Sequence, residues 1–179
     1  MDGKGLSGDG RHRQMSRRVL ITIWACLLNG VMFGLVKFFY EAIPVPMSSL
    51  LYCTFLGFTV TFAVGAEVRK LGAYFASIAL GILWVAGYLG FEAVLLWSPL
   101  PDIVAKTIAF GFMSFVIEAM NMLVTQKTPF RFVPLQFAVV IGVFSQQCQH
   151  IPYILAALII GMLAALLSKL IYVRLPEIK

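Results

Sequence analysis

Polar and ionisable side chains inside long apolar runs are the residues of this sequence best suited to chemistry. Ser114, Glu118 and Asn121 recur at helical spacing and would line one face of a helix. A charged side chain in the middle of a membrane helix costs about 2.5 to 3.5 kcal/mol on insertion scales, so it needs a partner or a function. This face is therefore either a structural polar seam or a proton- or substrate-linked site that faces a cavity.

Two ion pairs are predicted from the depths of the other charges. Glu92 and Lys106 lie at similar distances from a proline-rich turn, so adjacent antiparallel helices would bring them level. Glu118 and Lys169 both lie near the predicted cytoplasmic ends of their own apolar runs and form the second predicted pair. Gln136 is a buried amide of the kind that joins helices in lipid, and Asn29 is another.

Small and polar residues form two stripes with a spacing of four. The first stripe is Ser49, Cys53, Gly57 and Thr61, and the second is Pro134, Ala138, Gly142 and Gln146. Such stripes either allow close helix packing or line a pathway. Uncharged polar residues at the end of the second stripe suit a neutral or dipolar solute, or belong to a helix end that frays into water. The candidate pathway residues are Ser49, Cys53, Gly57, Thr61, Ala138, Gly142, Ser145, Gln146 and Gln149.

Catalysis and metal binding have little support in the sequence. The cysteines Cys26, Cys53 and Cys148 are isolated and lack metal-ligand spacing, and the only histidines are His12 and His150. Enzymes need a clustered nucleophile and base or a set of metal ligands. The sequence therefore predicts a protein that is not an enzyme, with no catalytic residue, no metal and no cofactor.

The elements that must position these residues are membrane helices. Of the 179 residues 60% are hydrophobic and 12% are charged, about half the charged content of a soluble domain. A spanning helix needs about 20 apolar residues. The sequence predicts an all-α integral membrane protein with six transmembrane helices, over residues 19–40, 47–65, 71–97, 103–124, 132–148 and 151–173.

Flanking segments and basic residues set the predicted topology. Residues 1–18 are expected to form a disordered basic cytoplasmic tail, residues 19–174 the membrane domain, and residues 175–179 a cytoplasmic C-terminal tail. With the N-terminus inside, all but two of the 14 Lys and Arg residues fall on the cytoplasmic side, which places both termini there. The net charge of +6 thus reflects membrane topology, and nucleic-acid binding is not expected.

An internal duplication is indicated by the two stripes. Superposing Gly57 on Gly142 aligns them, and Gly81 can be matched to Gly161 if five residues around Glu67 to Lys70 are treated as an insertion. The repeats would cover about residues 19–97 and 102–174. Because each repeat holds an odd number of helices, the second copy would be inverted, an arrangement typical of channels and transporters.

Short phrases carry a resemblance to a known family. They are Phe55-Leu56-Gly57, Thr61-Phe62-Ala63, Leu80-Gly81, Trp84-Val85, Phe132-Val133-Pro134 and Ile141-Gly142. With them the chain resembles the YcdZ-like family of bacterial inner-membrane proteins, whose members carry a domain of unknown function. The chain departs from that pattern at Gln146, Gln147 and Cys148. The resemblance implies a compact six-helix fold in the bacterial inner membrane and supplies no activity.

These observations together predict a small channel or transporter for a small neutral or weakly charged solute. The alternative is a non-transporting scaffold or an accessory subunit of a membrane complex, with the basic tail as its docking segment. Six short helices can hardly enclose a large cavity, so a homo-oligomer in the lipid bilayer is expected under either interpretation.

Overall fold

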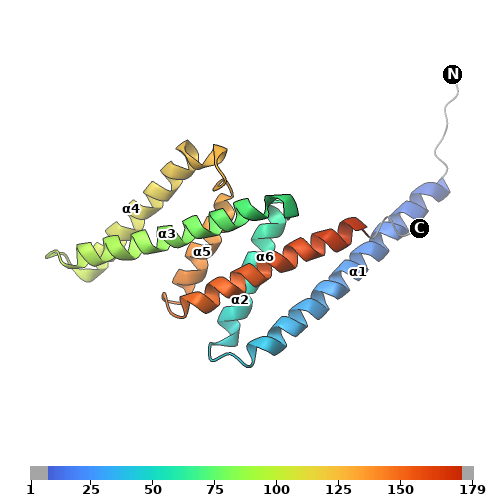
Figure 1. Cartoon of the computed structure of the whole chain (residues 1–179), viewed down its shortest axis with the longest axis horizontal. Helices are drawn as coiled ribbons and strands as arrows, with labels where there is room; N and C mark the ends of the chain where they lie inside the picture. Colours follow the sequence, from blue (N-terminus) through green and yellow to red (C-terminus); the bar gives the residue numbers. More distant parts are fainter. Residues whose placement is uncertain (1–7, 175–179) are drawn as a thin grey trace, which may run out of the picture. The chain divides into compact units, whose positions relative to one another are not determined.

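The computed structural model describes the backbone of residues 8–174 and the side chains of most residues between 19 and 171 (Figure 1). Within 8–174 it contains α-helices, two short 3-10 turns and no strand, which confirms the predicted all-α class. The long helices α3 (Leu71–Leu96), α4 (Asp102–Leu123) and α6 (Ile151–Arg174) match the predicted ranges to within one residue at either end. Prolines and charged residues had marked those ends in the sequence.

Helix α1 is longer than predicted. It runs over Gly8–Tyr40, so residues 8–18 are helical where a disordered tail was expected. Once the apolar run that follows is helical, each further residue adds a hydrogen bond without a new nucleation step. The arginines of this stretch are also good helix formers. The rest of the expected tail, residues 1–7, and the C-terminal tail, residues 175–179, lie outside the described residues.

Helices α2 and α5 are shorter than predicted. Helix α2 covers the 17 residues Met47–Ala63 and α5 the 13 residues Val133–Ser145. Left-handed backbone ends each of them, at Gly65 and Ala66 after α2 and at Gln147, Cys148 and His150 after α5. At 1.5 Å per residue the two helices measure about 25 and 20 Å, less than the ~30 Å hydrocarbon core of a bilayer.

Three helices are long and apolar enough to cross a membrane, over Val68–Leu96, Asp102–Leu123 and Ile151–Ile171. Three apolar segments among the described residues are shorter, namely Cys26–Tyr40, Met47–Ala63 and Val133–Ser145. The prediction of six spanning helices is therefore not confirmed, because length and composition support three.

The chain divides into two compact units. One is Val45–Leu166, and the other combines Met1–Pro44 with Leu167–Lys179. This division cuts across the predicted repeats because helices from both halves pack together within Val45–Leu166. There, α3 packs against α4 and α5, and α2 packs against α5. Figure 1 shows the short helices α2 and α5 running across the direction of the long helix α3.

Glycines set the closest helix approaches within Val45–Leu166. A Cβ atom on Gly57 would overlap the backbone carbonyl of Leu158, and one on Gly161 would overlap the carbonyl of Thr54. Helices α2 and α6 therefore touch backbone to backbone. Helix α3 meets α5 in a similar way at Gly81, where a Cβ would lie 2.9 Å from the carbonyl oxygen of Gln136. Only residues without a side chain permit such distances.

Candidate functional site

The two predicted stripes face one another between α2 and α5. The Ser49 hydroxyl at the start of α2 donates a hydrogen bond to the Oε1 atom of Gln146 at the end of α5. One turn further into α2, the Cys53 sulfur lies 3.6 Å from where a Cβ on Gly142 would be. The helices are thus antiparallel, and two residues from each predicted stripe meet along the line between them.

The stripe residues are packed rather than open. Ser49, Cys53, Thr61 and Ala138 are all buried, with at most 8% of their surface exposed, and Gly57 and Gly142 are buried as well. Two cavities, of about 120 and 110 Å³, lie within Val45–Leu166, and none of these six residues lines either one. In this conformation the stripes pack the helices against each other.

Thr61 leaves a polar atom without a partner near the opposite end of α2. Its side chain is fully buried, and its hydroxyl makes no hydrogen bond within the described part of the chain. Its carbonyl accepts a hydrogen bond from the amide of Ala66, at 3.0 Å, as the chain turns out of the helix. A buried hydroxyl without a partner costs about 1 to 3 kcal/mol, so the Thr61 hydroxyl is a feature that packing alone does not favour.

The predicted outer polar cluster lies in the turn between α5 and α6. Ser145 donates to the carbonyl of Gly142 at 2.9 Å, and the Gln146 amide group donates to the Ser145 hydroxyl at 3.3 Å. Gln149 is exposed. Burial raises the pKa of the Cys148 thiol in this turn, and the negative charge of Glu92 raises it further. The turn thus combines a short hydrogen-bonded chain with a thiol whose pKa is raised.

The predicted polar face of α4 does not form one continuous seam. The buried face of this helix follows a spacing of four and ends at Asn121, whose Oδ1 accepts a hydrogen bond of 2.9 Å from Thr125. The Asn121 Nδ2 has no partner among the described residues. Ser114 is half-buried beside a cavity, and Glu118 is exposed. Both sit one position round the helix from the buried face, which explains the separation.

The ion pair predicted between Glu92 and Lys106 is not formed. Among the described residues the salt bridge present joins Lys70 to Glu67 at 2.5 Å. Lys106 is exposed on α4, one position beyond the buried Ala105. The sequence predicted that the two charges lie at the same depth, but depth does not fix the direction in which a side chain points. Glu118 and Lys169 belong to different compact units, so their pairing stays a prediction.

Gln136 is the best-connected buried polar residue of α5. Its side chain is fully buried, its Nε2 donates to the carbonyl of Phe130 at 2.6 Å, and its Oε1 accepts from the Trp84 indole at 2.9 Å. The amide therefore joins α5 to α3, in line with its expected role between helices. The sequence had singled out Gln136 as an amide in an apolar run, but nothing in it indicated Trp84 as the partner.

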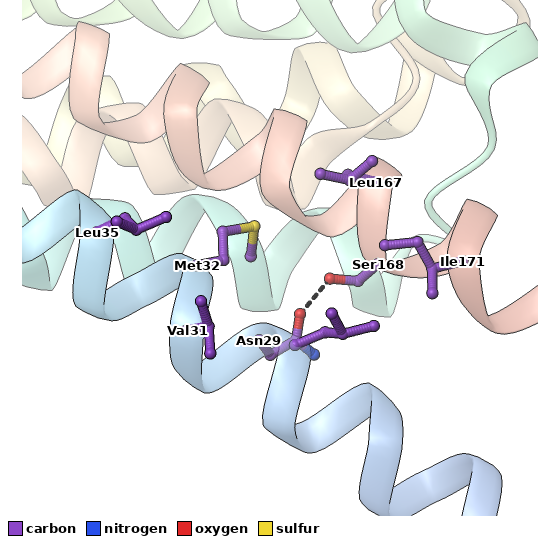
Figure 2. Close-up of a pocket in the computed structure, with 8 residues that line it drawn as sticks. Asn29, Val31, Met32, Leu35, Leu167, Ser168 and Ile171 are labelled. Carbon is purple, nitrogen blue, oxygen red and sulfur yellow. Dashed lines mark hydrogen bonds between the residues drawn. The ribbon is translucent and has the colours of Figure 1, made fainter.

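A separate cavity lies in the other compact unit. It measures about 260 Å³ and is lined by residues of α1 and of the last turns of α6. In Figure 2 the Ser168 hydroxyl donates a hydrogen bond to the Oδ1 of Asn29 beneath apolar side chains that include Met32 and Leu35. Asn29 thus bonds to a second helix, as expected for a buried amide in an apolar run.

Comparison with known protein families, with curated proteins and with solved structures finds no match to this chain. Its function therefore has to be inferred from the site itself.

Proposed function

We propose that this protein transports a small neutral or weakly charged solute along the line between α2 and α5. The carrying observation is the pair of short apolar helices, of 17 and 13 residues, that pack together inside Val45–Leu166. Unusually short apolar segments at corresponding positions of two halves are typical of transporters, where they form the solute site near mid-membrane.

The pattern of helix crossings supports two inverted three-helix repeats. Helix α2 of the first half crosses α6 of the second at Gly57 and Gly161, and α5 of the second half crosses α3 of the first at Gly81. Each short helix thus packs on the long third helix of the other half. Two halves related by symmetry that share one core would make such reciprocal contacts.

The conformation described here corresponds to a closed state of the proposed path. Ser49 and Gln146 close the line at the end where α2 begins, through a hydrogen bond between neutral groups. Such bonds between membrane helices contribute about 0.6 kcal/mol on average, so thermal motion opens them readily. The unpartnered hydroxyl of Thr61, about three turns along α2 from Ser49, is the group we assign to hydrogen-bond the solute.

The membrane location and the homo-oligomer predicted from the sequence are also part of this proposal. The resemblance to the YcdZ-like family supports a multi-pass protein of the bacterial inner membrane. The distribution of Lys and Arg supports cytoplasmic termini. Exposed apolar side chains on the outer faces of α3 and α4, such as Leu83 and Phe115, support contact with lipid or with further copies of the chain.

Reversible crosslinking of the two short helices tests the transport proposal. In a variant freed of Cys26, Cys53 and Cys148, Ser49→Cys and Gln146→Cys would be joined by a cleavable bifunctional thiol reagent. Solute entry into proteoliposomes would be followed by light scattering with small polyols, amides and weak acids. We expect the crosslink to stop entry and reduction to restore it, while each single cysteine treated with the same reagent keeps entry intact.

A scaffold or accessory subunit is the second candidate, because the stripe residues are buried and tightly packed in this conformation. Under this alternative, folded protein would pass no solute of the panel above the leak of empty liposomes. Entry that continues at full rate through the crosslinked protein would also overturn the assignment of the path to α2 and α5.

A further inference from the structure

A cavity with aromatic walls lies between α3, α4 and α5, away from the α2–α5 stripes. Its volume is about 110 Å³. Five rings contribute to its wall, those of Trp84, Tyr88, Phe110, Phe137 and Phe144. Half of its lining residues are therefore aromatic.

The rings are held in place by their own contacts. Tyr88 meets Phe144 edge to face with ring centroids 4.6 Å apart, and it meets Phe110 at 6.2 Å. The Trp84 indole is fixed by its hydrogen bond to Gln136. Edge-to-face pairs at these distances are favourable, so the wall is ordered without any bound molecule. A pre-ordered wall loses little side-chain freedom when a ligand enters.

Ser114 supplies a hydroxyl to this apolar wall. Some helical hydroxyls of the chain bond back to the carbonyl four residues earlier, as those of Ser77 and Thr107 do at 2.8 and 2.7 Å. Ser114 lines the cavity, and no hydrogen bond involves its hydroxyl in the part of the chain that the structure describes. The cavity therefore offers one free hydrogen-bonding group among aromatic surfaces.

We propose that this cavity binds a neutral single-ring aromatic molecule with one polar group, of the size and chemistry of phenol. A closed apolar cavity of about 150 Å³ binds benzene, and the space here is smaller but open beside Phe110 and Ile141, so it limits the ligand to a single ring that reaches the opening. No charged side chain lines the cavity, which disfavours ionised ligands. Phe110 and Ile141 line it and are about half exposed, so entry is from the lipid-facing side.

This binding site stands independently of the transport proposal, and binding to the full chain in detergent tests it directly. Replacing Trp24 and Trp97 by Phe leaves Trp84 as the single fluorescent tryptophan of the three. We expect phenol to change Trp84 emission in a saturable manner. We expect Ser114→Ala to weaken phenol binding about five- to tenfold, the loss of one hydrogen bond, and to leave benzene binding unchanged. If Ser114 has only a structural role, Ser114→Ala would change the affinities for phenol and benzene equally.

Variants that fill a cavity supply the matched controls. Val140→Phe places a ring in the aromatic cavity and should abolish binding of phenol and benzene, since Val140 lines it. Ala86→Leu fills the neighbouring cavity of about 120 Å³ and should leave binding intact. A linear response of the same size in Val140→Phe would show simple partition into detergent and overturn the proposal. Cyclohexanol binding as tightly as phenol would overturn the aromatic specificity, and the Ser114→Ala comparison remains informative if Val140→Phe fails to fold.

Discussion

The two glycine crossings of the Val45–Leu166 unit differ in how closely the helix backbones approach. Where α2 meets α6, Gly57 and Gly161 bring backbone against backbone from both sides. Where α3 meets α5, a single glycine, Gly81, approaches the backbone at Gln136, and hydrogen bonds flank the contact. Besides the Gln136 bonds, the Ser77 hydroxyl accepts from the amide of Phe132 at 3.3 Å.

This difference separates distance from orientation. A glycine contact fixes how close two helices come. A network of hydrogen bonds fixes which faces meet, because each donor must reach its own acceptor. We therefore call the α2–α6 contact at Gly57 and Gly161 the close crossing, and the α3–α5 contact with the Gln136 and Ser77 hydrogen bonds the braced crossing. The predictions below test this contrast in order of expected effect.

We expect the largest loss of stability from a substitution at the close crossing of α2 and α6. Gly161→Ala would push a Cβ into the Thr54 carbonyl, and only a movement of one helix backbone could relieve the overlap. We expect a loss of at least about 3 kcal/mol in the free energy of unfolding, beyond the usual cost of overpacking because no side chain can yield. Thermal unfolding in detergent measures it.

Gly90→Ala is the matched control for this prediction. Gly90 also lies in a long helix, but a Cβ there meets nothing within 4 Å. The change should leave stability unaltered or raise it by up to about 1 kcal/mol, the helix propensity difference between Gly and Ala. Equal melting temperatures for Gly161→Ala and Gly90→Ala would contradict the backbone contact.

Substitutions at the braced crossing of α3 and α5 should lower stability by a smaller amount. Gln136→Leu leaves the Trp84 indole N–H and the Phe130 carbonyl without their partner, and we expect a loss of about 1 to 3 kcal/mol. Adding Trp84→Phe removes the orphaned donor and should recover part of that loss. Additive effects of the two substitutions in thermal unfolding would mean that the two side chains do not interact.

The sequence predicted both ends of α3, α4 and α6 and the starts of α2 and α5 to within one residue, but it placed the C-terminal ends of α2 and α5 two and three residues too late. Prolines and charged residues mark the former by residue type. By contrast, Ala66, Cys148 and His150 adopt left-handed backbone although they are not glycines, and their type does not announce it. Such conformations are imposed by the packing around them, so short-range patterns cannot locate these helix ends.

The same limit applies to the candidate site. Spacing identified Ser49 and Gln146 as members of two stripes, and the structure brings them into contact. The spacing did not indicate that Gly57 would face α6. Helical periodicity shows which residues share one face of a helix, but not which helix packs against that face. The missed Trp84 and the unformed pair of Glu92 and Lys106 have the same cause, since both depend on how each helix is rotated.

Thr61 near the end of α2 distinguishes a packing role from a solute contact. Thr61→Val keeps the shape and removes the unpartnered buried hydroxyl, so we expect stability to rise by about 1 kcal/mol. Solute entry into proteoliposomes should fall in the same variant if the hydroxyl binds the solute. Thr107→Val, at an exposed position whose hydroxyl bonds to its own helix, is the control and should change neither quantity.

The smallest expected effect is electrostatic and lies in the turn between α5 and α6. The pKa of the Cys148 thiol is raised first by burial and then by the charge of Glu92, so the reactive thiolate forms only at higher pH than in an ordinary cysteine. In protein lacking Cys26 and Cys53, Glu92→Gln should lower this pKa and speed maleimide labelling about two- to threefold at fixed pH, equivalent to a few tenths of a pH unit. Burial persists in that variant, so the pKa should remain above the ordinary value.

Glu118→Gln is the control, because it removes an exposed carboxylate on α4, and it should leave the labelling profile unchanged. Identical profiles for both variants would place Glu92 too far from the turn to act on the thiol.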